Sequence, residues 1–113
     1  MKEDSFMERR RFRRPRLRLN VKASIGDQPI GHVLNLTDEG VCLTGRGVPP
    51  GQMQPLRLDF PIPLYGQREV AVMAIPRWHD YLPNGHWRGG FHLQVDDNAA
   101  SILTTLAGRY GDV

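Results

Sequence analysis

The sequence predicts an all-β fold with one helix: a small antiparallel six-stranded β-barrel followed by a C-terminal α-helix. Three observations support this fold class. Short segments in which apolar and polar residues alternate recur along most of the chain. Turn-forming residues separate these segments at the spacing that is typical of all-β domains. Only the last segment, about residues 97–110, has its apolar residues at helical spacing.

The domain organisation follows from length and charge. The chain has 113 residues, which suits one compact domain with a modest core. We expect the barrel and helix to occupy residues 15–113. Residues 1–14 are rich in like charges and poor in apolar residues, which predicts a flexible basic arm.

The first three strands are expected within residues 17–45. Apolar residues alternate with polar ones from Leu17 to Ile25, which indicates one half-buried strand. The segments IGHVLNL and GVCLTG indicate two more strands, and the polar loop NLTDEG joins them.

The remaining strands are expected between residues 56 and 95. LRLDF alternates again, and the two prolines and the glycine of PIPLYGQ are expected to interrupt the pattern. EVAVMAI is apolar after its first residue, which favours a central strand covered on both faces. DYLPNG is expected to form a hairpin connection to the last strand, GFHLQV.

The helix is expected from a stripe of apolar residues and its flanking signals. The stripe consists of Ile102, Leu103, Leu106 and Tyr110. Asp96 or Asp97 can cap the N-terminus of this helix, and Gly108 or Gly111 can end it.

Positive charge is concentrated at the N-terminus. Seven arginines lie between Arg9 and Arg18, and residues 1–18 carry a net charge of +5, whereas residues 19–113 carry −2. The arm, and not the barrel, is therefore the candidate anion-binding element. The run contains no lysine. Because arginine forms paired hydrogen bonds with a phosphate or a guanine edge, this choice favours shaped recognition over a solubilising tail.

The residues argue against an enzyme. The four histidines are scattered without a short metal-binding spacing, and neither a nucleophile elbow nor a phosphate-binding NTPase loop is present. The single cysteine, Cys42, cannot form an intramolecular disulfide and is expected to be buried. We therefore expect no catalytic residue, no metal and no cofactor.

The expected location is cytoplasmic. No apolar run in the sequence approaches the length of a membrane span. The N-terminus lacks the apolar stretch of a secretory signal.

The loop NLTDEG admits two interpretations. In the first it is an ordinary turn, in which Asn35, Thr37 and Asp38 hydrogen-bond to the local backbone and Gly40 has a positive φ. In the second, Asn35 and Thr37 lie on one face at a strand end and present polar groups to a ligand.

Taken in order, these segments resemble the PilZ domain, a family of bacterial receptors for cyclic di-GMP. The family's Arg-x-x-x-Arg motif is similar to ERRRFRR, in which Arg10 and Arg14 fit best and Arg9 and Arg13 offer the same spacing. Its [Asp/Asn]-x-Ser-x-x-Gly motif, some twenty residues later, is similar to NLTDEG. The resemblance continues at AIPRWHD, at GGFHLQV and at the helix, so it covers nearly the whole chain.

The resemblance implies a ligand and a set of contacts. The ligand is cyclic di-GMP, and the implied contacts are Arg9, Arg10, Arg13, Arg14, Asn35, Thr37, Gly40 and Trp78. Trp78 would close an apolar wall beside the ligand or would simply pack, whereas Trp87 is expected to pack. Thr37 replaces the family's serine and Asn35 has no carboxylate, so weaker binding is expected than in members with Asp and Ser.

The resemblance also implies a stoichiometry and a mode of action. A basic residue just before the arginine pair, here Arg9, implies two stacked cyclic di-GMP molecules per protomer. The ligand is expected to order the arm and so change the surface that a downstream partner protein reads. Two alternatives stay open: a nucleic-acid-binding barrel, which the acidic body disfavours, and a PilZ adaptor that binds only protein.

Overall fold

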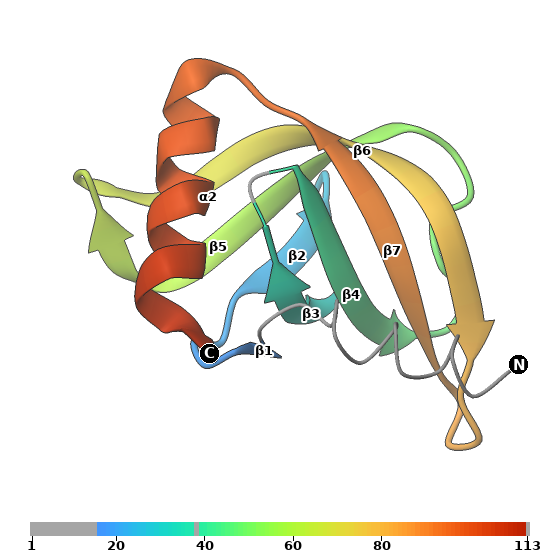
Figure 1. Cartoon of the computed structure of the whole chain (residues 1–113). Coiled ribbons are helices and arrows are strands. Elements are labelled where there is room, and N and C mark those ends of the chain that lie inside the picture. Colours follow the sequence, from blue (N-terminus) through green and yellow to red (C-terminus); the bar gives the residue numbers. More distant parts are fainter. Residues whose placement is uncertain (1–15, 38, 113) are drawn as a thin grey trace, which may run out of the picture.

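The computed structural model describes residues 16–37 and 39–112. Its main strands are β2 (Lys22–Ile25), β3 (Gln28–Leu36), β4 (Gly40–Arg46), β5 (Gln54–Leu64), β6 (Gln67–Tyr81) and β7 (His86–Gln94). Neighbours pair antiparallel in the order β2-β5-β6-β7-β4-β3, and β3 pairs again with β2, which closes the barrel (Figure 1). The predicted six-stranded antiparallel barrel is therefore confirmed.

Two short strands extend the sheet beside β3. They are β1 (Arg16–Leu17) and β8 (Gly111–Asp112), which pair with each other, and β1 also pairs with β3. The first and last described segments of the chain therefore lie side by side. Arg16, the first residue of β1, lies opposite Asn35 of β3.

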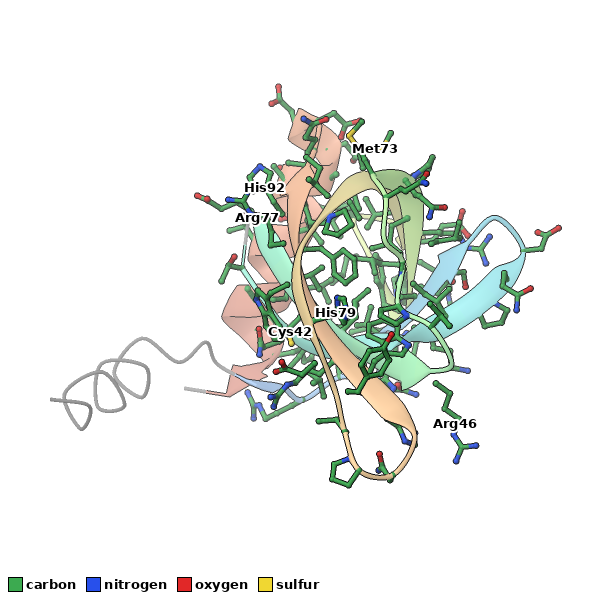
Figure 2. The ribbon with its side chains drawn as sticks, turned by 90° about the vertical axis from the view of Figure 1, so that its right-hand side faces the viewer. Cys42, Arg46, Met73, Arg77, His79 and His92 are labelled. Carbon is green, nitrogen blue, oxygen red and sulfur yellow. The ribbon has the colours of Figure 1, made fainter. Side chains whose placement is uncertain are left out.

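The predicted helix is confirmed as α2 (Asp97–Tyr110). Asp96 is its N-cap, and the carboxylate accepts a hydrogen bond from the backbone N–H of Ala99 at 2.7 Å. Its buried face consists of Ala99, Ile102, Leu103 and Leu106, all part of the core. Both views place α2 across one end of the barrel (Figures 1 and 2).

Trp87 occupies the barrel core, as expected. It is fully buried, and its indole Nε1 donates a hydrogen bond to the backbone carbonyl of Arg46 at 3.2 Å. Its own backbone carbonyl accepts from the hydroxyl of Thr44 at 2.7 Å. Its ring meets Phe91 edge to face, with 6.5 Å between ring centroids.

The first expected strand is divided in two, so the prediction of one strand from Leu17 to Ile25 is wrong. The expected alternation survives, because Leu17, Val21 and Ala23 are buried while Arg18 and Asn20 are exposed. The division arises because β1 pairs with the far end of β3 and with β8, whereas β2 pairs with the start of β3 and with β5.

The segment PIPLYGQ does not interrupt the pattern as expected, because β5 continues to Leu64. Its prolines, Pro61 and Pro63, are exposed and lie where the register with β6 shifts, so no ladder hydrogen bond needs their missing N–H. The turn itself consists of Tyr65 and Gly66, with φ values of 51° and 78°, as a two-residue type I′ hairpin requires.

Strand β6 is buried on one face only, so the prediction of a strand covered on both faces is wrong. Val70, Val72 and Ala74 point into the core, whereas Ala71 between them is exposed. The reason is that α2 covers an end of the barrel and leaves this outer face uncovered.

Within the described part of the chain, no helix is long and apolar enough to cross a membrane.

Candidate ligand-binding site

A row of residues crosses the outer face of the barrel over four neighbouring strands. Trp78 of β6 lies opposite Gly90 of β7, Gly90 opposite Cys42 of β4, and Cys42 opposite Asn35 of β3. The neighbours of these residues along β4 and β7, including Val41 and Phe91, belong to the core. Because side chains alternate along a strand, the row points away from the core of the barrel, although Cys42 within it is buried, as the sequence predicts.

A cleft of about 530 Å³ opens on this face. Its walls come from the β3–β4 loop, from β6 and from β7, and its lining residues are Thr37, Glu39, Gly40, Arg77, Trp78, Gly90, Phe91 and His92. Segments that are some forty residues apart in sequence thus meet at one concave surface. A cleft of this size falls in the range of small-molecule sites, roughly 300–1,000 Å³.

A β-bulge in β6 gives the cleft two adjacent side chains from one strand. Pro76 lies opposite Phe91 and Trp78 lies opposite Gly90, so Arg77 is an extra residue without a partner on β7. In a regular strand, neighbouring side chains point to opposite faces, but a bulge re-aims them. Both Arg77 and Trp78 consequently line the cleft.

The indole of Trp78 lies directly over Gly90. A Cβ atom at position 90 would be 2.2 Å from Trp78 Nε1, so only glycine allows this close approach. The guanidinium of Arg88 lies 6.0 Å from the centroid of the indole ring and is paired with Asp80 at 3.3 Å. Trp78 as a whole residue is nonetheless 45% exposed, so its indole offers a face on which a planar ligand can stack.

The loop between β3 and β4 contains the local bonding that the first interpretation of NLTDEG predicts for Thr37, but not for Asn35, whose Oδ1 has no hydrogen-bond partner among the described residues. The hydroxyl of Thr37 accepts from the backbone N–H of Gly40 at 3.1 Å and from that of Glu39 at 3.4 Å. The N–H of Thr37 donates to the carbonyl of Gly40 at 2.9 Å. Gly40 itself is not among the residues with positive φ, so that part of the interpretation is wrong; it begins β4 and pairs with His92.

The structure brings together three of the residues that the sequence singled out. Thr37, Gly40 and Trp78 line the same cleft. Asn35 does not line it: this residue lies on β3 opposite Cys42, and its buried Oδ1 has no hydrogen-bond partner within residues 16–37 and 39–112. The four arginines Arg9, Arg10, Arg13 and Arg14 lie outside the described residues.

Sequence reasoning missed three polar residues of the cleft: Glu39, Arg77 and His92. Figure 2 shows Arg77 and His92 beside each other at one edge of the barrel. His92 could have been found, because it is an outward position in the alternating segment GFHLQV. Arg77 could not, because nothing in the sequence marks the bulge that brings it to the same face as Trp78.

Comparison with known proteins supports the resemblance at the level of the fold. The structure of the Bacillus subtilis inhibitor of motility (MotI/DgrA) matches this chain with a TM-score of 0.62 and 16% sequence identity. The match covers 88% of this chain and 50% of that protein, so the chain spans about half of its length. No protein-family model matches the chain, and no curated protein matches it. The likeness therefore shows the fold alone, and the chain is a six-stranded antiparallel β-barrel with a C-terminal helix.

Proposed function

We propose that this protein is a receptor for cyclic di-GMP, which binds between the arginine-rich arm and the outer-face cleft. The observation that carries this proposal is the meeting of Thr37, Gly40 and Trp78 in one cleft. These residues come from two separate segments that resemble PilZ motifs, and the fold itself supports the same family.

Chain connectivity supports a contribution from the arm. The described chain begins at Arg16, opposite Asn35, and Thr37 lies two residues beyond Asn35. Since each residue spans at most about 3.6 Å, the Cα of Arg14 is within about 7 Å of that of Arg16, and the Cα of Arg10 within about 22 Å. Both arginines of the pair can therefore reach the cleft without any rearrangement of the barrel.

The chemistry of the ligand suits these residues. Cyclic di-GMP carries two phosphates and two guanines, and guanine O6 and N7 are acceptors that match an arginine fork. Trp78 supplies a stacking face for a base, and Arg77 adds a cation on the cleft wall. Stacking by Trp78 and charge pairing by Arg77 involve no chemical reaction, so the proposed role of the site is recognition.

We propose that ligand binding changes the surface that the outer face of the barrel presents to other proteins. Ligand phosphates neutralise the like charges of residues 1–14 and hold the arm over the outer face of β4 and β7. A downstream partner protein then reads the covered cleft, which in the free protein exposes Trp78.

Calorimetric titration with cyclic di-GMP tests this proposal through Arg14→Ala. The variant is expected to bind about 10- to 100-fold more weakly, because it loses a charge-assisted hydrogen-bond donor. The matched control is Arg68→Ala: Arg68 is exposed at the start of β6, and its guanidinium donates a hydrogen bond to the carbonyl of Pro61. This control is expected to bind as the wild type does.

Two results would contradict the proposal. Equal affinity of Arg14→Ala and the wild type would remove the arm from the site. Displacement of the nucleotide by a mixed oligonucleotide, with a steep salt dependence and no preference for the dinucleotide, would favour a nucleic-acid-binding barrel.

A further inference from the structure

We infer that Glu39 reads the Watson–Crick edge of a guanine and so gives the cleft its preference for that base. This inference rests on the proposed function, and it adds which edge of the base is recognised and by which residue. Glu39 occupies a variable position of the second motif, so the resemblance assigns it no role.

The backbone of Glu39 is fixed while its side chain is available. Its N–H donates to the hydroxyl of Thr37 at 3.4 Å, and its carbonyl accepts from the N–H of Leu93 at 2.9 Å. The residue is exposed, and its carboxylate forms no hydrogen bond or ion pair with another residue of the described ranges. A ligand in the cleft can therefore meet this carboxylate without breaking an existing contact to the barrel.

Glu39 and Trp78 stand on opposite walls of the cleft. Glu39 precedes the first residue of β4, Trp78 belongs to β6, and β7 lies between these strands with Gly90 and His92. Neighbouring strands are about 4.8 Å apart, so β4 and β6 are separated by about 10 Å. A base that stacks on the exposed face of Trp78 therefore directs the edge farther from β6 toward the β3–β4 loop.

The charge of Glu39 determines what that edge must present. Among the described residues that line the cleft, Glu39 is the one carboxylate. An ionised carboxylate only accepts hydrogen bonds and repels a phosphate, so it fits a pair of adjacent N–H donors. The guanine edge offers N1–H and the N2 amino group side by side. Adenine offers an acceptor at N1, and hypoxanthine keeps N1–H but has no amino group at C2.

Arg77 complements this arrangement from the β6 side. Its guanidinium has only donors and forms no hydrogen bond or ion pair to another described residue. It therefore suits the acceptors of the ligand, guanine O6 and N7 or a phosphate, which Glu39 cannot bind. One acidic and one basic residue across the cleft thus fix the orientation of a base that has donors on one edge and acceptors on the other.

A titration of three proteins with two nucleotides tests this inference. The proteins are the wild-type chain, Glu39→Ala and the control Glu69→Gln, whose exposed side chain lies on β6 in the segment that pairs with Asp59 of β5. The probes are cyclic di-GMP and its inosine analogue, cyclic di-IMP, which lacks the two N2 amino groups. We expect the wild type and Glu69→Gln to prefer cyclic di-GMP about tenfold or more, since a site built for a donor rejects an analogue without it. Glu39→Ala is expected to bind both nucleotides with similar affinity.

The outcomes separate this inference from the proposed function. If Glu39→Ala keeps the wild-type preference for cyclic di-GMP, Glu39 does not read the base, although the receptor function stands. If the wild type binds neither nucleotide, the proposed function and this inference both fail. Thermal unfolding of Glu39→Ala checks the fold, and an unchanged midpoint is expected because the side chain is exposed.

Discussion

Replacing Gly90 by alanine tests the stacking face without removing any side chain. The new Cβ would lie 2.2 Å from Nε1 and 2.6 Å from Cε2 of Trp78, so the indole must recede to ordinary contact at 3.4 Å or more. Because Trp78 is exposed, its ring can turn toward solvent, and we expect the free energy of unfolding to fall by only about 1 kcal/mol. A displaced ring loses its stacking on a bound base, which is worth about 1–3 kcal/mol, so cyclic di-GMP should bind about tenfold more weakly.

A double-mutant cycle makes this prediction sharp. Gly90→Ala and Trp78→Ala are expected to weaken binding by similar factors, and the double variant by no more than the larger of the two, because both act through the same ring. Gly51→Ala is the matched control, since a Cβ there meets nothing within 4 Å. Wild-type affinity of Gly90→Ala in calorimetry, or additive losses in the double variant, would show that Trp78 does not stack on the bound base.

Three further predictions concern the helix and the stoichiometry. Asp96→Ala should lower the free energy of unfolding by about 1 kcal/mol, because the N–H of Ala99 loses its 2.7 Å partner; a denaturation midpoint equal to that of the wild type would show that the cap contributes nothing. Gly108→Ala should raise the free energy of unfolding by about 0.5–1 kcal/mol, since this residue lies within α2 and a Cβ there meets nothing within 4 Å; a loss of stability in denaturant would contradict that account. Calorimetry at saturation should give two cyclic di-GMP molecules per chain, as Arg9 implies, and a ratio of one would reject the intercalated pair.

The sequence predicts those parts of the fold that depend on local periodicity. Alternating residues identify the inward positions of β5 and β7, and the stripe through Ile102 and Leu106 identifies α2. The burial of Trp87 was also predictable, because an aromatic side chain at an inward position of a barrel strand fills the core.

Features that depend on pairing between distant strands were not predictable. Whether the first strand continues from Leu17 to Val21 depends on which part of β3 each half meets. The bulge at Arg77 arises from the register of β6 against β7, which no local pattern records.

The sequence predicts only those residues of the candidate site that belong to a recognisable motif. Short motifs identify Thr37 and Gly40, and the resemblance identifies Trp78. Glu39 could not be predicted, because it occupies a variable position of its motif. Its backbone is held by a hydrogen bond from the N–H of Leu93, which lies more than fifty residues away in the sequence.

The most direct test of the account is a titration of the isotopically labelled full chain with cyclic di-GMP, followed by nuclear magnetic resonance. We predict saturable shifts at the amides of Gly40 and Gly90 and at the indole N–H of Trp78, all of which belong to the cleft. The amide of Gly66, in the β5–β6 turn, should not move. Unchanged spectra would contradict the assignment of this site. Shifts confined to another cleft would contradict it as well; that cleft is lined by Leu17, Arg18, Leu19, Asn20, His32, Val33 and Leu34.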